Sequence, residues 1–206
     1  MTTLDDKGDR LASFMAEPST SRLEAFSDGV IAIIITIMVL ELRAPSEPTL
    51  GGLLKIAPEF LTYAISFVVI AIIWVNHHPL IQAARAPTAR LLWSNFYLLF
   101  WMSFVPFVTE FLGRDYREPL AVALYGLVLF LCTSGFYFLR VELIHQSQED
   151  KALVKYHKGI QHKNAIAAAL YLLSVPLAYL TIYASFCIFA LLPAMYFLPE
   201  KKLFGE

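Results

Sequence analysis

Charged side chains are scarce in this sequence: Asp, Glu, Lys and Arg make up 16% of its 206 residues, against about 25% in ordinary soluble domains. The apolar and aromatic set AVILMFWYC supplies 58% of the chain, and the mean hydropathy is +0.60. A soluble globule of this size would lack the polar side chains needed to coat its surface. We therefore expect an integral, multi-pass membrane protein whose surface faces the lipid bilayer.

Three further absences exclude other classes of protein. The formal net charge is −1, so the chain has no basic excess to bind nucleic acid. Its two cysteines, Cys132 and Cys187, lie inside apolar runs, which excludes a disulfide framework and a cysteine metal site. The first 24 residues contain five acidic residues and no A-x-A cleavage site, unlike a secretory signal peptide. We expect residues 1–20 to be retained as a polar tail.

Long, mostly apolar stretches predict the number of membrane spans. A helix needs about 20 mostly apolar residues to cross the hydrocarbon core, and four stretches meet this need, at about 23–42, 59–77, 90–110 and 119–140. The 36 uncharged residues between Lys163 and Glu200 would form one helix about 54 Å long, which exceeds the bilayer. We expect a hairpin of two spans there, at 163–180 and 183–199. The predicted fold is all-α, with six transmembrane helices in one domain over residues 21–206.

The distribution of basic residues orients these spans. Six spans place both termini on one side of the membrane, and the tails and loops of that side carry twelve Lys and Arg residues. The loops of the opposite side carry four. Because basic residues concentrate in cytoplasmic loops, both termini are predicted to be cytoplasmic.

Asp28 is a deep charge in the first predicted span, and an acid inside a membrane helix is by default a functional-site hypothesis. The alternating directions of the spans bring Trp74, His77 and Asn95 to the same cytoplasmic third of the membrane. These side chains offer hydrogen-bond donors to a buried carboxylate. We expect a polar network that holds the helices together, with Asp28 bonded to His77 or Asn95 and with Ser27 nearby.

A metal site formed by Asp28, His77 and His78 is an alternative reading of the same residues. Adjacent histidines on a helix diverge by about 100° and rarely share a metal. The sequence therefore favours the network over a metal site.

A second feature of the first span is an isoleucine stripe. At about 100° per residue, Ile33, Ile37 and Leu40 lie within about 60° of one another, with Thr36 at the edge, whereas Asp28 points roughly 120° away. The residues alone fit an ordinary lipid-facing or packed surface.

Two segments resemble a known family. Residues 22–29 read RLEAFSDG and are followed by Ile33 and Thr36, a pattern that resembles the first-helix signature of the endosomal and lysosomal potassium channel family, transmembrane protein 175. The later segment WVNHH at 74–78, together with Asn95 and the pair PF at 106–107, is similar to that family's second and third helices.

The resemblance implies a potassium-selective cation channel in the plasma membrane of a prokaryote, assembled as a homotetramer whose first helices line a central pore. It places the family's isoleucine constriction on Ile33, with Thr36, Ile37 and Leu40 as further positions of the ion pathway. It also makes Phe26, Ser27 and Asp28 an anchor between helices and subunits. The complete anchoring network is expected to comprise Arg22, Phe26, Ser27, Asp28, Trp74, His77 and Asn95.

The expected mechanism is unusual for potassium. The chain has no TVGYG run for a carbonyl filter and no arginine ladder for voltage sensing. The remaining candidate for the selectivity filter is a narrow ring of aliphatic side chains. Such a ring favours K⁺ over Na⁺, because K⁺ loses its water more easily, and it can close the pore by dewetting. We expect K⁺ as the permeant ion, no cofactor and no enzymatic activity.

Two other classes fit the composition. A secondary transporter would show two similar halves with helices broken at matching positions, and the two halves of this chain share no signature. A membrane-embedded enzyme would need a nucleophile or a ligand set converging at one depth. The secondary transporter is the main alternative.

Overall fold

The computed structural model describes residues 20–147 and 151–196, and every regular element in them is a helix. Residues 1–19 of the predicted tail and the last three residues of the predicted sixth span lie outside the described residues. The helices are α2 (Thr20–Leu40), α3 (Leu50–Lys55), α4 (Ala57–Gln82), α5 (Ala89–Met102), α6 (Val105–Arg114), α7 (Pro119–Gln146), α8 (Lys151–Leu180) and α9 (Ile182–Tyr196).

Five segments are long and apolar enough to cross a membrane: α2, α4, α5 with α6, α7, and His157–Leu180 of α8. The chain is therefore a membrane protein whose regular structure, over the described residues, is entirely helical. The apolar helix Ile182–Ala194 is shorter, and the 15 residues of α9 rise only about 23 Å. The sixth span thus stays a prediction. The long uncharged stretch breaks at Thr181, between α8 and α9.

The third predicted span consists of two helices. α5 ends at Met102, and α6 starts at Val105 with Pro106 in its first turn. Proline fits the first turn of a helix but not its interior, because it has no N–H and its ring clashes with the preceding turn. The Ser103 hydroxyl lies at the break and donates to the Phe100 carbonyl at 2.6 Å.

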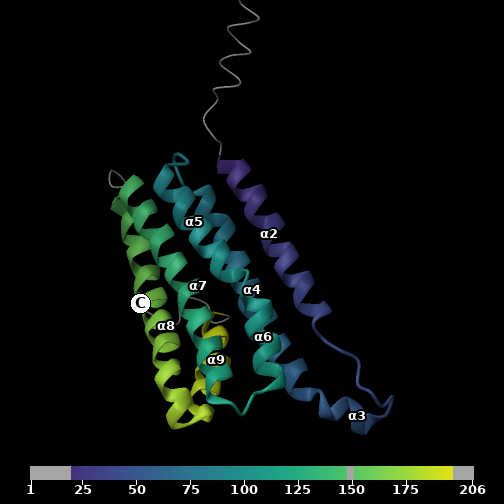
Figure 1. Cartoon of the computed structure of the whole chain (residues 1–206). Coiled ribbons are helices and arrows are strands. Elements are labelled where there is room, and N and C mark those ends of the chain that lie inside the picture. The colour runs from purple at the N-terminus through teal and green to yellow at the C-terminus, as the bar shows by residue number, and fades with distance from the viewer. Residues whose placement is uncertain (1–19, 148–150, 197–206) are drawn as a thin grey trace, which may run out of the picture.

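The long helices run side by side, and the chain reverses direction from one to the next (Figure 1). α7 packs against α8, α5 and α6, whereas α2 packs against α4, α5 and α6 at the edge of the bundle. The start of α2, the end of α4 and the start of α5 consequently lie at the same end of the molecule (Figure 1). α3 lies at the opposite end.

Close contact between α5 and α7 depends on Gly135. A methyl group at this position would lie 2.9 Å from Leu98 Cβ and 3.0 Å from its backbone Cα. Small residues let membrane helices approach in this way. Gly135→Ala should therefore lower the unfolding free energy in detergent by about 1–3 kcal/mol, the usual cost of overpacking.

The matched control is Gly159→Ala in α8, where a methyl group would meet nothing within 4 Å. This change should be neutral or stabilising by up to about 1 kcal/mol, because alanine is the better helix former. Equal effects of the two substitutions on thermal unfolding would contradict the packing role of Gly135.

Candidate functional site

α2 has two distinct faces. Its buried face packs on the neighbouring helices and consists of Leu23, Ser27, Ile31, Ile34 and Met38. The face on the other side is uncovered in the single chain and includes all four residues of the predicted ion pathway: Ile33, Thr36, Ile37 and Leu40. Ile33 is 58% exposed and Leu40 is 78% exposed.

Thr36 is the polar member of this uncovered face. Its hydroxyl donates to the Ile33 carbonyl within the helix, at 2.9 Å. Because that bond uses the hydroxyl proton, the oxygen lone pairs remain available as acceptors. A hydroxyl in this state can face a cation.

A groove of about 570 Å³ borders the uncovered face, where α2 meets the break between α5 and α6. Ile33, Ile37 and Phe107 contribute apolar lining, and Ser103 lies at the break itself. Glu41 and Glu110 also line the groove. The groove is therefore lined by both aliphatic side chains and carboxylates.

A buried hydrogen-bond network joins α2, α5 and α4. His77 Nε2 lies 2.7 Å from Asn95 Oδ1, and Asn95 Nδ2 donates to Ser27 Oγ at 2.8 Å. The Ser27 hydroxyl in turn donates to the Leu23 carbonyl at 2.8 Å. This direction requires that His77 carries its proton on Nε2. His77, Asn95 and Ser27 have no exposed surface, so three of the predicted anchoring residues form one continuous network.

Asp28 has a different partner from the expected ones. Its Oδ1 accepts a hydrogen bond from Trp74 Nε1 at 3.0 Å, and the prediction of His77 or Asn95 as its partner was wrong. The Nε2 atom of His77 is hydrogen-bonded to Asn95 instead of to Asp28. Asp28 and Trp74 thus connect α2 to α4 beside the buried network rather than inside it.

The two remaining anchoring residues lie on the outside of the chain. Phe26 is 53% exposed and packs edge-to-face on Phe96 of α5, with ring centroids 5.8 Å apart. Arg22 is exposed in the first turn of α2.

The metal alternative from the sequence, with Asp28, His77 and His78 as ligands, does not assemble. The His77 ring is buried on Asn95, whereas His78 forms an ion pair with Glu24, a residue absent from the predicted site.

A second polar network, which was not predicted from the sequence, lies deeper in the bundle. Thr109 Oγ1 of α6 donates to Ser66 Oγ of α4 at 2.7 Å, and Ser66 Oγ lies 2.9 Å from the Tyr125 hydroxyl of α7. The available signal was the matching depth of these polar residues in the second, third and fourth spans. The network holds α4, α6 and α7 together without any contribution from α2.

The comparisons with known proteins agree on one family. A family model described as Endosomal/lysosomal potassium channel TMEM175 matches residues 22–106. A potassium channel of Chryseobacterium sp. (strain P1-3) is 36% identical over 182 residues, which covers 88% of this chain and 94% of that protein. The human endosomal/lysosomal proton channel TMEM175 is 28% identical over 188 residues, and the match spans 36% of its length.

A solved structure is also similar. The crystal structure of a lysosomal potassium-selective channel TMEM175 homolog from Chamaesiphon minutus superposes with a TM-score of 0.74 at 27% identity. The match covers 86% of this chain and 95% of that one.

Proposed function

Because the chain belongs to the endosomal/lysosomal potassium channel TMEM175 family, we propose that it is a potassium-selective channel of the prokaryotic plasma membrane. Four copies form a symmetric homotetramer with α2 innermost and both termini in the cytoplasm. The family membership supports a cation channel, and the choice of potassium follows the name of the Chryseobacterium relative.

The uncovered face of α2 is the observation that carries this proposal. Ile33, Thr36, Ile37 and Leu40 lie exposed along one side of a helix whose other side is packed. A single helix face cannot enclose a path, whereas four related faces can. A ring of four chains also buries these apolar side chains between the subunits, whereas a single chain leaves them exposed.

In this arrangement the Ile33 side chains form the narrowest ring of the pore. A cation passing an aliphatic ring must shed part of its water, and K⁺ dehydrates at a lower cost than Na⁺. The Thr36 oxygens, one helical turn away, replace part of the lost hydration. When the ring is tight, the pore closes by dewetting.

Potassium flux into liposomes tests the proposed function. Purified protein in vesicles should carry K⁺ down its gradient without a coupled substrate, and the protein should have the mass of four chains in nanodiscs. Flux that requires a second solute gradient would instead establish the secondary transporter, and a monomeric protein would contradict the shared pore.

Asp28→Ala should weaken assembly more than it changes ion preference. The substitution removes the acceptor of the Trp74 indole N–H, which costs about 0.5–1.5 kcal/mol at a partly exposed position. Asp28→Asn keeps an acceptor oxygen and should restore the tetramer fraction on size exclusion. Normal assembly of the alanine variant with lost preference for K⁺ would place Asp28 in the ion path.

A further inference from the structure

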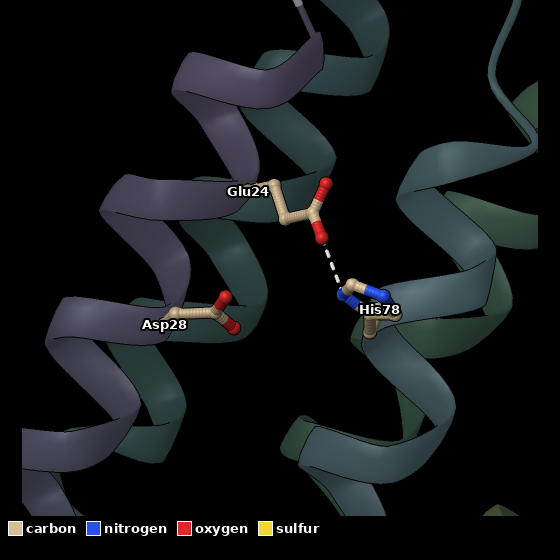
Figure 2. Close-up of side chains that lie close together, drawn as sticks. All are labelled: Glu24, Asp28 and His78. Atoms are coloured by element: carbon tan, nitrogen blue, oxygen red, sulfur yellow. Dashed lines mark ion pairs between the residues drawn. The ribbon is translucent and has the colours of Figure 1, made fainter.

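Two carboxylates and one imidazole converge where the first turns of α2 meet the last turns of α4. Glu24 and Asp28 are four residues apart and therefore share a face of α2, and His78 reaches them from α4 (Figure 2). Ligand atoms of the three residues lie within 4.8 Å of one another. Glu24 Oε1 and His78 Nδ1 form an ion pair.

This residue set has the chemistry of a transition-metal site. Imidazole nitrogen and carboxylate oxygen bind Zn²⁺ at about 2.0–2.2 Å, usually with four ligands in a tetrahedron, so the ligand atoms end up about 3.5 Å apart. Small side-chain rotations achieve this, because the His78 side chain is 48% exposed and Asp28 is half-buried. Water has access to the fourth position.

Trp74 already orients one of the three ligands by a hydrogen bond, and Gln82 lies where it can orient a second. Trp74 Nε1 donates to Asp28 at 3.0 Å, which fixes that carboxylate. The Gln82 amide lies 3.0 Å from His78 Nε2, and a flip of that amide lets it accept the proton that a metal-bound imidazole carries on this nitrogen. Such outer partners set the orientation of metal ligands.

Charge balance argues against a simple ion pair. Glu24 and His78 suffice for a pair, and Asp28 adds a second carboxylate oxygen within 4.8 Å of the same imidazole. A divalent ion balances both carboxylates and leaves the imidazole neutral, as a metal ligand must be.

We propose that Glu24, Asp28 and His78 form a binding site for a divalent transition-metal ion of the zinc class, which bridges α2 to α4. The bridge ties the cytoplasmic end of α2 to its neighbour within the same chain. Binding itself does not depend on the conduction pathway, but the effect of the bridge on a pore helix rests on the proposed function.

Calorimetric titration of the full chain in nanodiscs with Zn²⁺ tests the site. We expect one Zn²⁺ per chain, with a change in the total tryptophan fluorescence because the Trp74 indole contacts a ligand. Glu24→Gln and His78→Gln should each weaken binding by at least about tenfold, while K⁺ flux without added metal persists in both. Millimolar Mg²⁺ should not displace Zn²⁺, because Mg²⁺ prefers oxygen ligands.

The matched control is His145→Gln, which changes an exposed histidine at the end of α7 and should leave Zn²⁺ binding intact. Absence of binding to the wild type would overturn the proposal, as would unchanged affinity in both ligand variants or equal competition by Mg²⁺. Because these readouts measure binding, a failed flux assay and a failed metal site remain distinguishable.

Discussion

Replacing Ile33 with asparagine should raise the K⁺ current several-fold and bring the permeability ratio of K⁺ to Na⁺ close to one. In the proposed tetramer, four asparagines wet a ring that is otherwise lined only by carbon, and dewetting depends steeply on polarity and radius. An ion that keeps its water is no longer selected by the cost of losing it. Ile33→Ala widens the same ring and should act in the same direction. Current amplitude and the bi-ionic reversal potential measure both effects.

Ile35→Ala is the matched control for the alanine variant. Ile35 is half-buried and packs against the core of its own chain, about 200° around the helix from Ile33. Its truncation should affect stability and leave selectivity unchanged. Unchanged current and selectivity in both Ile33 variants would move the constriction to Ile37 or Leu40.

Asn95→Leu should cause the largest loss of stability. The substitution keeps the branched shape and the number of side-chain heavy atoms but removes two interhelical hydrogen bonds, to His77 and Ser27. Such bonds contribute about 0.6–1.7 kcal/mol each in membrane proteins, and the buried His77 N–H also loses its acceptor. We expect a decrease of about 2–4 kcal/mol in unfolding free energy, measured by denaturant titration in detergent.

Asn76→Leu provides the comparison. Asn76 Nδ2 donates to the Ile72 carbonyl of its own helix at 2.7 Å, and within residues 20–147 and 151–196 its side chain makes no hydrogen bond to another helix. Its replacement should cost less than about 1 kcal/mol. If both asparagine variants unfold at the same denaturant concentration, the network does not anchor α2.

The membrane class was predictable because it depends on composition, which needs no tertiary information. The position of the Ile33 stripe followed from helix periodicity alone, and the side chains lie on one uncovered face. Its role in conduction stays a prediction, since periodicity does not tell a pore face from a lipid face.

The partners of Asp28 were not predictable in the same way. Topology sets the depth of each residue along the bundle, and Trp74, His77 and Asn95 do lie near α2 at one level. Which of them meets the carboxylate depends on the rotation of α4 and α5 about their axes, and sequence spacing within one helix does not determine the rotation of another. The same limit explains why Glu24 and His78 were missed as partners.

The attachment of α2 to its own chain is strongly one-sided. Its first third is fixed by the bonds of Ser27, Asp28 and Glu24, whereas the remainder rests on apolar packing of Ile31, Ile34 and Met38. When α2 tilts, we therefore expect it to rotate about a pivot near Ser27. Ile33 lies about 9 Å along the helix from that pivot and Leu40 about 20 Å, so a given tilt moves Leu40 roughly twice as far. In the proposed tetramer, any rocking of the helix thus changes the spacing between subunits most at Leu40 and least near the pivot.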